Sequence, residues 1–310
     1  MINLNYYPGC TLKTKAKNFE DSAIASMSAL GIALIELPRW NCCGASYCLA
    51  EDDLIHQVAP VRNLIRVKSQ ESRVESQGEG DSRLQTPDSR LLKVVTLCPF
   101  CYNTLKRANL IVRNDPGKRD TLNSFMDEEI DYHGEVETVH LLEVLRDDVG
   151  WEAIAKKVKV PLEGLIVAPY YGCTLIRPRE IAIDNVERPT VLHRLMETLG
   201  ATVVDFPFAT ECCGSFQSVS NPELAAETAW NILTLAQRQG AEALVLSCPL
   251  CEYNLGFQQK LIRRRHGEFK GIPTPYFTQL LALALGLESC GFDRGYTDSR
   301  ALLQSKGLLS

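Results

Sequence analysis

The cysteines constrain this chain more than any other feature of its sequence. There are 12 of them in 310 residues, and most lie in short motifs. Thiolates grouped at short spacings are the ligands that zinc ions and iron–sulfur clusters use. A chain of this length does not need disulfides in place of a hydrophobic core. The cysteines are therefore predicted to bind metal, and they are Cys10, Cys42, Cys43, Cys48, Cys98, Cys101, Cys173, Cys212, Cys213, Cys248, Cys251 and Cys290.

The cysteine motifs occur twice, in the same order. Each half contains a Gly-Cys, then a Cys-Cys-Gly, then a Cys-Pro-x-Cys motif. The pairs are YYPGCTL at 6–12 with YYGCTL at 170–175, NCCGAS at 41–46 with ECCGSF at 211–216, and CPFCYN at 98–103 with CPLCEYN at 248–254. Such self-similarity is typical of an internal duplication. The sequence therefore predicts two tandem domains, at 1–150 and 151–310.

One polar segment of the first half has no counterpart in the second. It is SQESRVESQGEGDSRLQTPD at 69–88, which contains few aliphatic residues. Such a segment cannot bury enough apolar surface to offset the entropy of ordering it. It is predicted to be a mobile surface insertion, with a solvated helix as the alternative.

Strands and helices are expected to alternate in both halves. Alternation of this kind predicts a parallel sheet flanked by helices, so the fold class is α/β in both domains. Strands are expected at 4–7, 32–37, 91–97, 165–171, 201–206 and 243–247, and helices at 15–30, 50–68, 189–199, 222–239 and 251–264. The cysteine motifs follow strands, so they are predicted to meet at the strand C-terminal ends, where α/β sheets bind ligands.

Each half offers five thiols, which leaves several metal centres open. A structural zinc site uses four ligands in a tetrahedron, so one thiol in each half would be surplus. A cubane iron–sulfur cluster also takes four terminal thiolates. A fifth thiolate would have to bridge irons or move aside.

The doubled motif resembles the CCG cysteine-rich domain proteins typified by the B-type subunit of heterodisulfide reductase. That resemblance implies one noncubane [4Fe-4S] cluster in each half, and reduction of a disulfide, or oxidation of dithiols in reverse, by one-electron steps. The ligands that it implies are Cys10, Cys42, Cys43, Cys98, Cys101, Cys173, Cys212, Cys213, Cys248 and Cys251. We assign the contact with substrate to Cys42, Cys43, Cys212 and Cys213, as a hypothesis. Cys48 and Cys290 have no counterpart in the other half.

The resemblance also implies partners. These are a flavin-containing subunit and a small ferredoxin-like iron–sulfur subunit. The chain itself shows neither a P-loop nor a GxGxxG motif, so another subunit would supply the electrons. The enzyme would then be an oxidoreductase acting on sulfur groups as part of a complex. The alternative is a non-catalytic electron-transfer subunit that links a succinate or 2-hydroxy acid dehydrogenase to quinone or another acceptor.

Composition excludes several other classes of function. The formal net charge is -5 and the pI is near 5.7, which argues against nucleic acid as a partner. The first residues show no basic and apolar pattern of a secretory signal. No apolar stretch reaches the roughly 20 residues of a spanning helix. We therefore expect a cytoplasmic protein without a direct membrane span.

Overall fold

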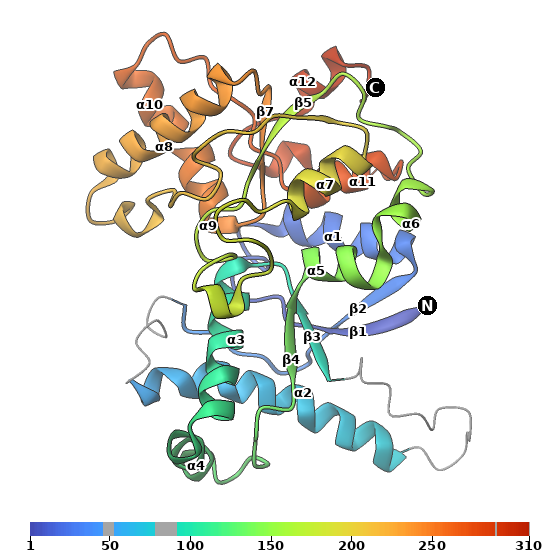
Figure 1. Cartoon of the computed structure of the whole chain (residues 1–310), viewed down its shortest axis with the longest axis vertical. Helices are drawn as coiled ribbons and strands as arrows, with labels where there is room; N and C mark the ends of the chain where they lie inside the picture. Colours follow the sequence, from blue (N-terminus) through green and yellow to red (C-terminus); the bar gives the residue numbers. More distant parts are fainter. Residues whose placement is uncertain (46–52, 78–91, 289, 310) are drawn as a thin grey trace. The chain divides into compact units, whose positions relative to one another are not determined.

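The computed structural model describes residues 1–45, 53–77, 92–288 and 290–309. It divides into two compact units, each built from two stretches of chain. Unit 1 contains Met1–Cys10 and Gly31–Leu141, and unit 2 contains Thr11–Leu30 and Leu142–Ser310. Each unit has a small parallel sheet flanked by helices (Figure 1). This confirms the predicted α/β class.

The sheet of unit 1 has four parallel strands. Their order is β2 (Ile32–Glu36), β1 (Ile2–Tyr6), β3 (Lys93–Thr96) and β4 (Glu137–His140). The helices of this unit are η2 (Leu54–Gln57), α2 (Val58–Gln77), α3 (Pro99–Asn114) and α4 (Pro116–Phe125). Strand β4 is not among the expected strands, and it runs directly into a helix that begins at Leu141.

Helix α2 is longer than the sequence predicted. It continues to Gln77, so the predicted mobile insertion is wrong for residues 69–77, which are helical. The remaining part, 78–88, lies outside the described residues.

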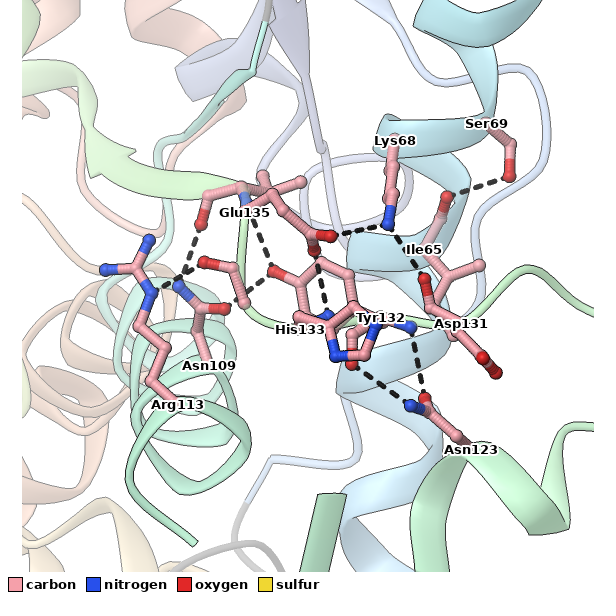
Figure 2. Close-up of polar contacts among 12 residues, drawn as sticks. Ile65, Lys68, Ser69, Asn109, Arg113, Asn123, Asp131, Tyr132, His133 and Glu135 are labelled. Atoms are coloured by element: carbon pink, nitrogen blue, oxygen red, sulfur yellow. Dashed lines mark hydrogen bonds and ion pairs between the residues drawn. The ribbon is translucent and has the colours of Figure 1, made fainter. Parts of the chain in front are cut away.

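A polar network fixes the segment that leads into β4 (Figure 2). The buried Tyr132 hydroxyl donates to Asn109 Oδ1 of α3 at 2.6 Å. The side chain of Asn123, in α4, bonds both the backbone N–H and the carbonyl of Tyr132. Lys68 of α2 forms an ion pair with Glu135 at 2.5 Å. Three helices therefore hold the start of this edge strand.

Unit 2 repeats the strand order with three strands. They are β6 (Thr202–Val203), β5 (Ile166–Tyr170) and β7 (Ala243–Leu246), all parallel. An isolated parallel bridge joins Leu246 to Tyr276, at the place where β4 lies in unit 1. The helices after the junction α5 (Leu141–Glu143) are η3 (Val144–Val149), α6 (Trp151–Ala155), η4 (Arg179–Ile181), α7 (Val191–Thr198), η5 (Ser215–Gln217), α8 (Pro222–Arg238), α9 (Pro249–Glu252), η6 (Tyr253–Phe257), α10 (Gln259–Arg265), α11 (Phe277–Ala284), η7 (Phe292–Arg294) and α12 (Arg300–Ser305).

Helix α1 (Lys17–Leu30) packs in unit 2, although it directly follows the first cysteine loop of unit 1. The Phe19 ring stacks on Tyr276 with 4.3 Å between centroids, and the Ser22 and Thr278 hydroxyls lie 2.7 Å apart. Both contacts join α1 to the start of α11 (Figure 1). The domain ranges 1–150 and 151–310 stay a prediction. The structure adds that α1, which belongs to the first range, packs in unit 2.

No helix among the described residues is long and apolar enough to cross a membrane.

Candidate metal centres

In each unit the cysteine motifs follow three neighbouring parallel strands. In unit 1, Cys10 follows β1, the Cys42-Cys43 pair follows β2, and Cys98 follows β3. Cys98 is also the residue before the first turn of α3, with Pro99 at the first helical position. Because parallel strands end at the same sheet edge, loops distant in sequence converge there. Unit 2 repeats this arrangement. Cys173 follows β5, the Cys212-Cys213 pair follows β6, and Cys248 follows β7, with Pro249 as the first residue of α9.

The five thiols of unit 1 form one continuous series of contacts. Cys10 Sγ lies 3.8 Å from Cys42 Sγ, and Cys43 Sγ lies 3.6 Å from Cys101 Sγ. Cys42 also contacts Cys43, and Cys101 contacts Cys98. The structure thus brings together all five cysteines that the sequence selected in this half, while their role as ligands stays a prediction.

The five thiols of unit 2 repeat the series in the same order. Cys173 contacts Cys212, which contacts Cys213. Cys213 contacts Cys251, and Cys251 contacts Cys248. The corresponding pairs of cysteines therefore interact in both units.

Each set has a buried side and a more open side. The second cysteine of each Cys-Cys pair and both cysteines of each Cys-Pro-x-Cys motif are buried. The more open members are Cys10 and Cys42, which are exposed, and Cys173 and Cys212, which are half-buried. A molecule that approaches either set would therefore meet the first cysteine and the first member of the Cys-Cys pair.

A glycine precedes the first cysteine in both sets, for a steric reason. Gly9 has φ +72°, and a Cβ there would lie 2.7 Å from Cys101 Sγ. Gly172 has φ +65°, and a Cβ there would lie 3.2 Å from Cys251 Sγ. The left-handed backbone disfavours a side chain at both positions, and at Gly9 the sulfur also lies too close for a Cβ unless it shifts. The backbone at these two glycines therefore forms one wall of each thiol cluster.

The surroundings of the thiols shift their pKa values in both directions. Hydrogen bonds from neighbouring thiols lower the pKa of Cys43, Cys212 and Cys248. Contacts with Cys43 and Cys98, together with burial, raise the pKa of Cys101. Contacts with Cys213 and Cys248, together with burial, raise the pKa of Cys251 in the same way. Metal ligation needs thiolates, and a bound cationic centre supplies the charge that stabilises them.

The donor set fits an iron–sulfur centre in its chemistry. Both sets consist of soft thiol sulfurs only, which is the ligand class of iron–sulfur clusters and of zinc. No group of three or more His, Cys, Asp or Glu side chains in the described parts of the chain surrounds a point suited to a single metal ion.

Cys290 and His140 make their hydrogen bonds to backbone carbonyls and not to the thiols of either set. Cys290 is buried, and its thiol donates to the Leu287 carbonyl at 3.1 Å. Cys48 lies outside the described residues. His140 is buried at the end of β4, and its Nε2 donates to the carbonyl of Leu97, the residue before Cys98. Burial lowers the pKa of His140 to about 4, so this side chain is a neutral structural donor near neutral pH.

The sequence drew attention to the Tyr6-Tyr7 and Tyr170-Tyr171 pairs, as packing or as walls of a substrate cleft, but did not indicate that Tyr7 and Tyr170 are equivalent. Tyr7 and Tyr170 are fully buried, and their hydroxyls donate to the carbonyls of Asn41 at 2.8 Å and Glu211 at 2.6 Å. Aligning the two Tyr-Tyr pairs would match Tyr7 with Tyr171 and not with Tyr170. The reason is that Pro8 adds one residue between the first pair and its cysteine. Counting back three residues from Cys10 and Cys173 would have matched the two tyrosines.

Comparisons with known proteins agree with the duplicated motif. The profile of the CCG cysteine-rich domain matches twice, over residues 4–106 and 167–256. A Wolinella succinogenes protein described as 8-methylmenaquinol:fumarate reductase membrane anchor subunit is 32% identical, over 96% of this chain and 98% of its own length. The B-type subunit of the ferredoxin:CoB-CoM heterodisulfide reductase of Methanosarcina mazei is 27% identical, over 92% of this chain and 90% of its own length. The resemblance inferred from the cysteine motifs is confirmed.

A solved structure shows the same fold. It is the crystal structure of a hypothetical protein from Helicobacter pylori, with a TM-score of 0.69 and 14% identity over 95% of this chain. The match covers 51% of the Helicobacter pylori chain, so this chain spans about half the length of that structure. The two curated relatives are both subunits of multi-subunit oxidoreductases, and an iron–sulfur electron-transfer role fits them.

Proposed function

This chain belongs to the family of CCG cysteine-rich domain proteins, and we propose that it is the disulfide-reducing subunit of a complex like heterodisulfide reductase. In this proposal each five-cysteine set holds one noncubane [4Fe-4S] cluster. The observation that carries it is the repeated series of thiol contacts, in which every one of the ten matched cysteines has a place.

The chemistry follows from the number of electrons that a disulfide needs. Reduction of a disulfide takes two electrons and two protons and yields two thiols. When bound, the pair of clusters supplies two one-electron steps, and the electrons come from a flavin-containing partner subunit. A small ferredoxin-like iron–sulfur subunit would complete the complex.

The buried and the exposed cysteines would have different roles in this reaction. Cys43, Cys98 and Cys101 of unit 1 are buried and would anchor the cluster. Cys42 is exposed, and its counterpart Cys212 is half-buried, so these two lie on the side that a substrate sulfur can reach. The hypothesis that Cys42, Cys43, Cys212 and Cys213 contact the substrate stays a proposal, and the first member of each pair is the more accessible.

Iron content and disulfide turnover test this proposal together. Anaerobically purified protein should hold roughly eight irons per chain, since each cluster has four. Cys43→Ala and Cys213→Ala should each lose the iron of one site only, and each should abolish turnover of a small disulfide with reduced viologen as the electron donor. Cys290→Ala is the matched control, because this buried cysteine lies outside both sets and should leave iron and turnover unchanged.

Two results would contradict the proposal. Zinc at full occupancy would exclude the clusters. A variant that lacks one cluster, folds and keeps near wild-type turnover would exclude a reaction that needs both.

A second candidate function is favoured by the relative from Wolinella succinogenes, whose description names a fumarate reductase and a membrane anchor. In that case the chain passes electrons between a flavoprotein dehydrogenase and a quinone without acting on a disulfide. Oxidation of the reduced protein by a quinone analogue but not by small disulfides would establish this function instead.

A further inference from the structure

The hydroxyls of Tyr7 and Tyr170 make the same hydrogen bond in the two units. Each tyrosine lies at the end of a central strand, three residues before the first cysteine of its set. Its hydroxyl donates to the carbonyl of the residue immediately before the Cys-Cys pair, Asn41 or Glu211. The bond therefore joins the strand that carries the first cysteine to the loop that carries the next two.

We infer that Tyr7 and Tyr170 are positioning residues, which hold the Cys-Cys pair of each set in place for cluster binding. This inference rests on the proposed function, because it concerns how cluster ligands are held. The Cys-Cys pair lies at the centre of the contact series: Cys42 contacts Cys10, and Cys43 contacts Cys101. A shift of the loop would thus separate thiols on both sides of the pair.

The phenol acts as a fixed donor and not as a source of protons. Burial raises the pKa of Tyr170, and negative charge at Cys251 and Cys213 would raise it further. Burial and the thiols of its own set raise the pKa of Tyr7 in the same way. The single hydrogen of each phenol is already bonded to a carbonyl, so the hydroxyl is held as a donor to the loop.

The two carbonyls that accept from the tyrosines differ in their other donors. The Asn41 carbonyl also accepts from Asn63 Nδ2 at 3.0 Å, and the Asn41 side chain accepts from Arg66 at 2.9 Å. Within the described ranges, Tyr170 is the only hydrogen-bond donor to the Glu211 carbonyl. Without its tyrosine the Glu211 carbonyl would lose its described donor, whereas the Asn41 carbonyl would keep Asn63. Other bonds hold the rest of the unit 2 loop, because Asn254 donates to the Cys213 carbonyl and Arg177 donates to the Thr210 carbonyl.

Replacing each tyrosine with phenylalanine removes the bond and keeps the ring. The variants are Tyr170→Phe and Tyr7→Phe in the full chain, purified anaerobically. Tyr171→Phe is the matched control, because Tyr171 is the next residue and is equally buried, but its hydroxyl bonds His193 Nδ1 at 2.7 Å and not a cysteine loop. The readouts are the electron paramagnetic resonance spectrum of the clusters and the rate of iron release to a chelator.

Tyr170→Phe should alter the signal of one cluster and accelerate iron release from one site roughly tenfold, the equivalent of one lost hydrogen bond. Tyr7→Phe should alter the other signal, with a smaller acceleration. Tyr171→Phe should lower the melting temperature and leave spectrum and iron release as in the wild type. If Tyr170→Phe does not fold, Tyr7→Phe provides the same test in unit 1.

Three outcomes would overturn the inference. The first is a Tyr170→Phe protein with wild-type spectrum and iron release. The second is an equal effect of Tyr171→Phe on the clusters. The third is lost activity with an unaltered spectrum, which would make the phenol a proton donor. A wild-type chain without iron would instead overturn the proposed function itself.

Discussion

Replacing Gly9 with alanine should damage the first thiol cluster as well as the fold. The backbone at Gly9 has φ +72°, which costs an L-residue roughly 1–2 kcal/mol. The new Cβ would also lie 2.7 Å from Cys101 Sγ, whereas carbon atoms in contact lie about 3.5–4.0 Å apart. Cys101 is buried among other thiols, so relief of this overlap should cost about 1–3 kcal/mol more. We expect a total loss of about 2–5 kcal/mol in the free energy of unfolding.

Gly31→Ala separates the two contributions. Gly31 belongs to the same unit and has φ +92°, but a Cβ there meets no atom within 4 Å. It should therefore show the backbone cost alone, with the iron content unchanged. Gly172→Ala, where the Cβ would lie 3.2 Å from Cys251 Sγ, should fall between the two.

Urea unfolding and iron per chain, both measured anaerobically, provide the assay. Gly9→Ala should lower the unfolding midpoint more than Gly31→Ala and should lose up to half of the iron. Equal midpoints for the two variants, with full iron in both, would refute the steric argument and leave Gly9 as an ordinary turn residue.

Two further predictions concern stability. Burial lowers the pKa of His140 to about 4 from its usual 6.5, so its stabilising contribution is complete above pH 6.5 and is lost as the pH falls toward 4. His140→Gln should remove up to about 3 kcal/mol of this acid dependence, as measured by urea midpoints between pH 4 and 7. An acid dependence equal to that of the wild type would contradict the buried neutral imidazole. Phe19→Ala should cost about 3–5 kcal/mol, because this buried ring packs against Tyr276 and Phe277. Exposed Ile24→Ala of the same helix is its control in a thermal melt, and an equal effect of both variants would contradict the packing of α1 in unit 2.

The strands and the cysteine loops could be predicted because their signals are local. A short apolar run followed by a cysteine motif marks a strand end, and parallel pairing then brings the strand ends together. The predicted strand at 243–247 corresponds to β7, and the predicted helix at 222–239 to α8. The same local reading failed at β4, because its four residues run directly into a helix and give no alternation of their own.

Other features depend on contacts that no single stretch of sequence contains. Nothing in residues 17–30 indicates that α1 packs with α11 of unit 2, because an amphipathic helix has the same pattern whichever sheet it covers. The hydrogen bonds of Tyr7 and Tyr170 likewise depend on where distant loops meet. Residues 69–77 remained helical despite their polarity, since a helix that is already formed extends more easily than a new one begins.

The residues that form and hold the thiol sets recur in both units, whereas residues farther from the thiols differ. The five cysteines, the glycine before the first cysteine and the tyrosine three residues before it recur in both units. The residue that lies beside the end of β3 or β7 differs between the units. In unit 1 it is His140, which pairs with β3 and donates to a backbone carbonyl. In unit 2 it is Tyr276, which bridges to β7 and stacks on Phe19. Two thiol sets with matching cysteines thus have different supporting residues at this position. Substitutions at the shared residues should therefore affect iron binding in either unit, and substitutions at His140 or Tyr276 should affect first the stability of their own unit.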